Sequence, residues 1–230
     1  MKTKLLNAVI LIAAGLLIAG CASTPKAVKY SDLPEAQKLQ ADPRFPHSQV
    51  FIKEGVNFKQ YSKFMIDPVE IFRGSGAKWS GVDEDTKQEI ARFLRAEFVR
   101  VLQSYGIVDK PGPGVLRLKF TLVDMQLTKP LLAAASHLSP AGFALNLGKG
   151  ATGSKGSFMG SVIYAGDLRD SVSGDLCAAF LTTQTPNAMD FTAMVTPADA
   201  ARKAITDSAE KFKLTVDRAH GIAPPAGGNR

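Results

Sequence analysis

A helical pattern of apolar residues begins near Thr86 and runs to Tyr105. Thr86-Lys-Gln-Glu89 fits a capping box, in which two side chains satisfy free N–H groups at a helix start. Gly106 predicts the C-terminal stop. The pairs Glu89–Arg92 and Glu97–Arg100 are spaced i,i+3 on the polar side and support a helix weakly. The predicted buried face comprises Ile90, Phe93, Leu94, Phe98, Val101, Leu102 and Tyr105.

Several stretches alternate apolar and polar residues as strands do. Residues 63–72 alternate, but their phase changes at Asp67-Pro68, which predicts a bulge on an edge strand. Residues 116–122 also alternate until the phase changes at Val123, where we expect a bulge or bend. Residues 161–168 and 175–182 predict a hairpin, with Gly174 in its loop because glycine adopts positive φ there.

Thr196-Pro197-Ala198-Asp199 predicts the start of a final helix, with threonine as cap and proline at the first helical position. The order is therefore strand, helix, three strands, helix. We predict an α+β two-layer domain, in which both amphipathic helices cover one face of a mostly antiparallel sheet of about four to five strands. The apolar stripe of the final helix comprises Ala201, Ile205, Ala209, Phe212 and Val216.

The first 20 residues have the pattern of an export signal. Lys2 and Lys4 precede an apolar run, residues 5–18, whose single polar member is Asn7. This run is too short to span a bilayer, which takes about 20 apolar residues. The following residues, Ile18-Ala-Gly-Cys21, resemble the lipobox of bacterial lipoproteins. The alternative, an uncleaved anchor with a chance cysteine, leaves the two small residues before Cys21 without a role.

The lipobox resemblance implies cleavage between Gly20 and Cys21, a diacylglycerol on the Cys21 sulfur and an acyl chain on its new amine. Several acyl chains hold a protein on a membrane far more firmly than one does. Lipoproteins with aspartate directly after the cysteine tend to stay in the inner membrane, whereas this chain has Ala22. The resemblance therefore implies the periplasmic face of the outer membrane.

Composition divides the chain into four parts. Residues 1–20 are the predicted signal peptide, and residues 21–47 are polar and proline-rich, which predicts a flexible tether spanning roughly 25 to 30 Å. Residues 48–220 are long enough for one domain. We expect residues 221–230, rich in proline and glycine, to be a disordered tail.

The formal net charge of +7 falls to +5 once residues 1–20 are removed, because 26 basic and 21 acidic residues remain. We interpret this as a solubilising excess, in preference to attraction of Lys26 and Lys29 to anionic lipids or cell-wall carboxylates. Because the lipobox resemblance implies a periplasmic location and the sequence has no nucleic-acid-binding motif, we expect no nucleic-acid partner. With Cys21 lipidated, Cys177 has no disulfide partner, and its apolar neighbours favour a small buried residue over a reactive thiol.

The stretch Gly166-Asp-Leu-Arg-Asp-Ser-Val-Ser-Gly-Asp-Leu-Cys-Ala-Ala-Phe180 resembles a domain family of unknown function found in Gram-negative lipoproteins. The resemblance covers roughly residues 50 to 217 and includes the long helix, the strand at 115–127 and the alanine-rich final helix. The chain departs from it at Asp175, where glutamate is more usual, and in having few aromatics after Phe180. The resemblance implies this fold and an envelope location, but no activity.

The sequence predicts no catalytic, cofactor-binding or metal site. His47, His137 and His220 lack cysteines or carboxylates at metal-ligand spacing. Nucleophile-elbow and phosphate-loop patterns are incomplete. The charged residues of one hairpin could form an acid–base site, although solvated turn charges are the favoured interpretation; they are Asp167, Arg169, Asp170 and Asp175. Trp79 could stack on a ligand, although a lid on the core is favoured.

Residues 130–148 form an uncharged run that Pro140 and Gly142 make unsuitable as a membrane span. Loops this long within a compact domain are usually functional or disordered. The favoured interpretation is a cover over the sheet, formed by Leu131, Leu132, Leu138, Phe143, Leu145 and Leu147. The alternative is an exposed surface for contact with a partner, formed by Leu138, Phe143, Leu145 and Leu147.

Three functions are compatible with these patterns. We favour a non-catalytic cell-envelope module that binds or scaffolds a protein or cell-wall partner, because this function requires only the predicted anchor, tether and compact domain. A lipid or small-molecule carrier would need a cavity between helices and sheet. A hydrolase would need polar groups that converge in one pocket. No cofactor is expected.

Overall fold

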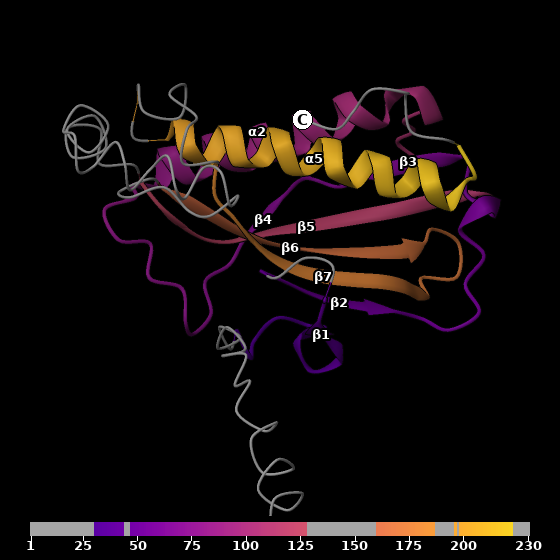
Figure 1. The fold of residues 1–230 in the computed structure, drawn as a ribbon, viewed down its shortest axis with the longest axis horizontal. Helices are drawn as coiled ribbons and strands as arrows, with labels where there is room; N and C mark the ends of the chain where they lie inside the picture. Colours follow the sequence, from indigo (N-terminus) through magenta and orange to yellow (C-terminus); the bar gives the residue numbers. More distant parts are fainter. Residues whose placement is uncertain (1–29, 44–46, 128–159, 187–195, 197, 223–230) are drawn as a thin grey trace, which may run out of the picture.

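The chain folds around one seven-stranded sheet with both long helices on one of its faces (Figure 1). The computed structural model describes residues 30–43, 47–127, 160–186, 196 and 198–222. The spatial strand order is β1-β2-β7-β6-β5-β3, and β4 also pairs with β5. The strands are β1 (Gln40–Ala41), β2 (Ser48–Ile52), β3 (Lys63–Ile66), β4 (Glu70–Ile71), β5 (Val115–Gln126), β6 (Ser161–Asp170) and β7 (Leu176–Gln184). The α-helices are α2 (Glu84–Leu102) and α5 (Asp199–Ala219), and the 3-10 helices are η1 (Ala36–Lys38), η2 (Phe58–Gln60) and η3 (Gln103–Tyr105).

The predicted α+β class and the placement of two helices on one face are confirmed, but the predicted strand count and order are wrong. Four strands precede α2 instead of one. Three of them, β1, β2 and β4, have two to five residues and show no alternation of buried and exposed positions. Such short strands are stabilised by their neighbours, as β2 is by antiparallel pairing with β7, so local pattern does not reveal them.

The region predicted as one bulged strand forms two short strands, β3 and β4, which both pair in parallel with β5. The break falls between them, around the predicted Asp67-Pro68 position. There the Asp67 carboxylate accepts a hydrogen bond of 2.9 Å from Arg117 Nε on β5. The other pairings in the sheet are antiparallel, including the predicted β6–β7 hairpin, where Gly174 has a φ of 76°.

Helix α2 begins earlier than its predicted capping box. Asp83 is the N-cap, and its side chain accepts a 2.7 Å hydrogen bond from the Thr86 backbone N–H. The capping-box prediction is wrong because Asp83 takes the role assigned to Thr86. The N-cap of α5 is Ala198, so the predicted threonine cap at Thr196 is also wrong. The Asp199 carboxylate accepts a hydrogen bond from the Thr196 backbone N–H.

The predicted ion pair between Glu97 and Arg100 is present at 3.0 Å, and Arg100 also pairs with Glu210 of α5 at 2.8 Å. Glu89 pairs with Arg202 of α5, not with Arg92 as predicted. Because α2 and α5 lie side by side, side chains on their polar sides join the two helices as well as neighbouring turns of one helix.

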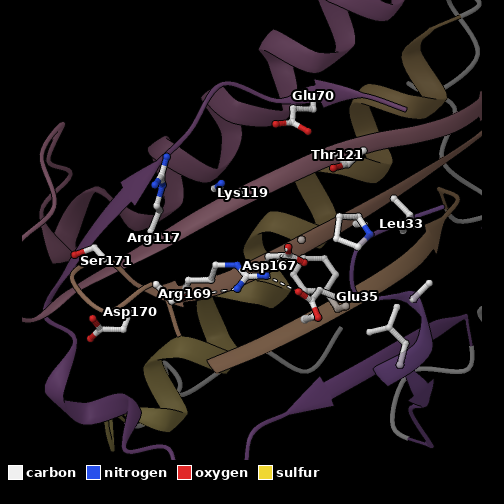
Figure 2. Close-up of a pocket in the computed structure, with 18 residues that line it drawn as sticks. Leu33, Glu35, Glu70, Arg117, Lys119, Thr121, Asp167, Arg169, Asp170 and Ser171 are labelled. Carbon is white, nitrogen blue, oxygen red and sulfur yellow. Dashed lines mark hydrogen bonds and ion pairs between the residues drawn. The ribbon is translucent and has the colours of Figure 1, made fainter. Parts of the chain in front are cut away.

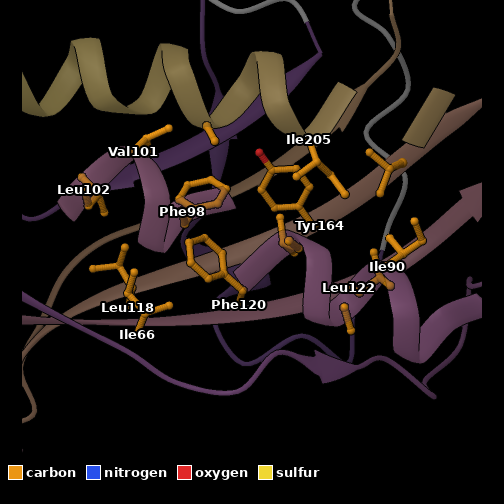
Figure 3. Packing of buried hydrophobic residues seen from close by; sticks show 14 of the residues in the cluster. Ile66, Ile90, Phe98, Val101, Leu102, Leu118, Phe120, Leu122, Tyr164 and Ile205 are labelled. Atoms are coloured by element: carbon orange, nitrogen blue, oxygen red, sulfur yellow. The ribbon is translucent and has the colours of Figure 1, made fainter. Parts of the chain in front are cut away.

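Aromatic rings fill the layer between the helices and the sheet (Figure 3). Phe98 of α2 is fully buried, and its ring centroid lies 4.4 Å from that of Phe120 and 6.2 Å from that of Tyr164. Glycine is required at position 166, because a Cβ there would lie 2.6 Å from the Phe180 ring. The predicted stripes of both helices are therefore confirmed as core.

A second, smaller cluster lies on the helix-free face of the sheet. A register shift between Leu122 and Asp124 confirms the predicted bulge and turns Val123 toward this face. Residues 30–39, here called the N-terminal strap, pack there and bury Tyr30 and Leu33. Residues 30–43 thus belong to the folded body, although composition assigns them to the tether. No helix among the described ranges is long and apolar enough to cross a membrane.

Asp124 fixes the loop that connects β4 to α2. Its buried carboxylate accepts hydrogen bonds from the backbone N–H groups of Lys78, Trp79 and Met125 at 2.8 to 3.1 Å. Asp124→Ala is expected to lower the free energy of unfolding by about 2 to 3 kcal/mol, because it leaves these donors without their acceptor. Urea denaturation would measure this, with exposed Asp109→Ala as control. A loss no larger than that of the control would contradict the assigned role.

Candidate functional site

A groove of about 470 Å³ lies on the helix-free face of the sheet, between the N-terminal strap and strands β5, β6 and β7 (Figure 2). Strand alternation explains its polar floor. Leu116, Leu118 and Phe120 face the helices, so the intervening side chains of β5 point the other way. The groove is lined on β5 by Arg117, Lys119 and Thr121, and on β6 by Asp167 and Arg169.

Arg169 lies at the centre of the groove (Figure 2). It forms an ion pair with Glu35 of the strap and a second one, at 3.6 Å, with Asp167. Its Nη1 also donates a 3.2 Å hydrogen bond to the Gly174 carbonyl. Arg169 therefore joins the strap, strand β6 and the hairpin turn.

Two arginines lie directly opposite each other on neighbouring strands, because Arg117 and Arg169 are register partners. Like charges in this position repel unless they are compensated. Arg117 is compensated by Asp67, with its Nε 2.9 and 3.1 Å from the two carboxylate oxygens, and Arg169 by Glu35. Each of the two arginines therefore forms an ion pair within the protein.

The acids of the groove differ in their electrostatics. Burial raises the pKa of Asp167 above its usual value, and the nearby Arg169 only partly offsets this. Burial also opposes ionisation of Glu35, but the ion pairs with Lys38 and Arg169 hold the pKa of Glu35 below its usual value. The ionised form of Asp167 is therefore poorly satisfied, whereas that of Glu35 is stabilised.

Asp167→Asn is expected to raise the free energy of unfolding at pH 7 by up to about 1 kcal/mol. A carboxyl whose pKa is raised in the folded state ionises at a lower pH in the unfolded state. It therefore lowers the free energy of unfolding above about pH 3.9, and this effect disappears below that pH. The gain should therefore shrink at pH 4. Urea titrations at both pH values test this, with Asp175→Asn as control because the Asp175 side chain is 65% exposed. A variant less stable than wild type at pH 7 would show that the Arg169 contact outweighs burial.

Lys119 and Glu70 differ from the other charged groups of the groove. Both side chains are exposed, and no hydrogen bond or ion pair joins either of them to another described residue. Lys119 is the register partner of Asp167 on β6, and Glu70 lies beside Thr121 on the other side of β5. These two groups are free to contact a ligand.

Three of the four charged hairpin residues, Asp167, Arg169 and Asp170, line the groove, whereas Asp175 does not. Asp170 accepts hydrogen bonds from the Val172 and Ser173 N–H groups and from the Tyr61 hydroxyl. These contacts hold the pKa of Asp170 below its usual value. Its carboxylate therefore stabilises the turn and does not act as a free acid or base.

Other polar groups also serve the fold. Ser171 Oγ donates to the Gly112 carbonyl at 3.0 Å and accepts from its N–H at 3.1 Å. His220 Nε2 lies 2.8 Å from the Tyr61 carbonyl oxygen. Within the described ranges, no group of three or more His, Cys, Asp or Glu side chains could hold a metal ion.

The predicted burial of Cys177 is confirmed, with the Tyr61 hydroxyl 3.4 Å from its sulfur. Trp79 packs at the edge of the core as predicted, donates from Nε1 to the Phe72 carbonyl at 3.2 Å and lies under Lys87 Nζ. Several predicted site residues fall outside the described residues; they are Gly20, Cys21, Leu138, Phe143, Leu145 and Leu147.

The sequence analysis did not predict the groove. The polar residues Arg117, Lys119 and Thr121 alternate with the predicted core residues and indicate a polar face of the sheet, which is the floor of the groove. The wall of the groove could not be predicted, because Glu35 lies 134 positions from Arg169 and in a segment that resembles a tether.

Comparison with solved structures gives only distant likenesses. A variant of the PelC dodecamer from Paraburkholderia phytofirmans is 7% identical with a TM-score of 0.39, over 72% of this chain and 95% of that one. A candidate lipoprotein from Caulobacter crescentus is 13% identical with a TM-score of 0.30, over 67% and 91%. A DUF4136 family protein from Bacteroides thetaiotaomicron is 13% identical with a TM-score of 0.35, over 75% and 96%. These likenesses carry no functional argument.

Comparison at the sequence level gives one family. No curated protein matches the chain. The model of a family described as protein of unknown function, DUF3313, matches residues 29–212. The match begins one residue before the described strap and extends into α5, so it includes every residue that lines the groove.

Proposed function

The chain belongs to DUF3313, a family of unknown function, and from that premise we propose that it is a lipid-anchored module of the cell envelope that binds a partner without catalysis. The Ile18-Ala-Gly-Cys21 sequence supports a lipid anchor on Cys21, and Ala22 supports the periplasmic face of the outer membrane. Fractionation of cell membranes on a sucrose gradient, with mass spectrometry of the mature N-terminus, tests the anchor and its location.

The observation that carries the binding function is the groove on the helix-free face. Its arginines form ion pairs within the protein, while Lys119 and Glu70 form none with another described residue. Side chains that are already held by internal contacts suit recognition, because they lose less conformational entropy when a ligand binds. The helix-facing layer is instead filled by Phe98, Phe120 and Tyr164, which favours the groove over an interior carrier site.

The strap supports a position of the groove near the proposed anchor. Tyr30 is 2% exposed and packs on the helix-free face, and eight residues separate it from Cys21. The nine Cα-to-Cα steps from Cys21 to Tyr30 reach about 30 Å when the chain is extended. Asp32 accepts hydrogen bonds of 2.7 Å from Ser75 N and Oγ, which also hold the strap on the folded body. If Cys21 is lipidated as proposed, this supports a groove that stays close to the membrane.

Photo-crosslinking in intact cells tests the binding role. A photoreactive amino acid at Thr121, on the groove floor, should capture a defined partner. The same amino acid at Arg92, on the exposed side of α2, is the matched control and should not. Equal capture at both positions, or none at Thr121, would contradict binding through the groove.

Residues 130–148 supply a second proposed contact surface, which lies outside the described residues. Replacing Phe143 and Leu145 together by serine is expected to weaken capture of the partner while the midpoint of thermal unfolding stays within about 2 °C of wild type. Thermal melts and crosslinking in cells give the two readouts. If the double variant unfolds instead, these residues belong to the core and the contact surface should be abandoned.

A further inference from the structure

The charge that the groove offers to a ligand is smaller than its composition implies. The lining residues include three basic side chains, Arg117, Lys119 and Arg169. Arg117 is neutralised by Asp67, and Arg169 by Glu35. Among the described lining residues, Lys119 is therefore the one cation without an ion pair.

Some acidic side chains of the groove are also paired within the protein and so are not available to a ligand. Glu35 is held by Arg169 and by Lys38, whose Nζ lies 2.7 Å from the carboxylate. Asp170 is held by the turn and by Tyr61. The remaining acids are Glu70, which is exposed, and Asp167, which lies on the floor 3.6 Å from Arg169. Burial raises the pKa of Asp167, and Lys119 lies near enough to lower it slightly.

These remaining groups lie on three adjacent strands. Lys119 on β5 has Asp167 beside it on β6, and Glu70 on β4 flanks Thr121, two positions further along the same face of β5. Strand spacing of about 4.8 Å and a rise of about 3.3 Å per residue put the Lys119 and Glu70 Cα atoms about 8 Å apart. A positive and a negative side chain thus lie on the same face of neighbouring strands and are exposed, without an ion pair between them.

We propose that the groove binds a small zwitterion, with its anionic group on Lys119 and its ammonium group on Glu70. This inference rests on the proposed binding function and specifies its ligand. A ligand of one sign would satisfy one of these two groups and meet the like charge of the other, whereas a zwitterion satisfies both. The volume of about 470 Å³ is in the range of small-molecule sites.

Two sources carry this chemistry: a short peptide with free termini and a phosphoethanolamine headgroup. The first would come from cell-wall or protein fragments, and the second from the membrane that the proposed anchor holds within about 30 Å. In both, an ammonium group and an anionic group lie a few bonds apart. Probes of the two kinds distinguish the sources.

The test is calorimetric titration of the full mature chain in a non-ionic detergent. The peptide probes are L-alanyl-L-alanine, its N-acetyl form, which is an anion, and its C-terminal amide, which is a cation. The headgroup probes are glycerophosphoethanolamine and glycerophosphate. At least one zwitterion should bind, and its single-sign analogues should bind about 10-fold or more weakly, because each loses one charge-assisted contact. Analogues that bind as tightly as the zwitterion, or no saturable binding by either zwitterion, would overturn the proposal.

Variants assign the two ends. Lys119→Gln should bind the zwitterion no more tightly than the cationic amide, because the anionic group has lost its partner. Glu70→Gln should bind the zwitterion no more tightly than the anionic analogue, because the ammonium group has lost its partner. Lys110→Gln, on an exposed turn outside the groove, is the matched control and should keep both preferences. Unchanged preferences in the groove variants would also overturn the proposal. Capture at Thr121 without zwitterion binding would reject this ligand and retain the binding function, whereas loss of both would reject both.

Discussion

Replacing Phe98 by alanine is expected to lower the free energy of unfolding by about 3 to 5 kcal/mol. Phe98 lies in the middle of α2, is fully buried and contacts rings from three other elements, with Phe120 at 4.4 Å, Phe212 at 5.3 Å and Tyr164 at 6.2 Å between centroids. Alanine would remove a buried ring and leave a cavity that two secondary-structure layers can only partly close. Urea denaturation monitored by circular dichroism measures the change.

Arg92→Ala is the matched control, because it alters the exposed side of the same helix. Its effect should stay within about 0.5 kcal/mol, as for most surface substitutions. A loss of less than about 1 kcal/mol in Phe98→Ala would mean that the aromatic layer reorganises around the missing ring. The role of Phe98 as an irreplaceable part of a fixed aromatic layer would then be wrong.

Replacing Cys21 by serine is expected to abolish lipidation and leave the full precursor in the inner membrane. Serine has no sulfur to receive the diacylglycerol, and under the lipobox resemblance the signal is cut only after that step. Labelling with a radioactive fatty acid, together with the mass of the chain, reports both modification and cleavage.

Cys177→Ser is the matched control for Cys21→Ser. Its sulfur is buried in the domain, so the substitution should leave fatty-acid labelling and cleavage unchanged. Ala22→Asp tests location separately and is expected to hold the lipidated protein in the inner membrane. A Cys21→Ser protein that is processed normally and reaches the outer membrane would refute the lipid anchor.

Local patterns identified the elements that have long periodic faces. The stripes of α2 and α5, the β6–β7 hairpin and the bulge before Asp124 follow from spacing, because a helix or a long strand shows its buried face within a few turns or residues. The start of α2 was misplaced, since Asp83 and Thr86 are both good caps and only the backbone geometry chooses between them. Lipidation of Cys21 remains a prediction from its neighbours alone.

The remaining features depend on contacts between distant segments. Short strands such as β2 exist because a distant strand, β7, supplies their hydrogen bonds. The strap, the groove and the division of charges into paired and free groups depend on contacts such as Arg169 with Glu35, which no local period encodes. The two-layer core could be predicted from local spacing, because hydrophobic burial follows the period of each element. The site needed the tertiary structure, because an ion pair or a groove wall depends on which distant segments meet.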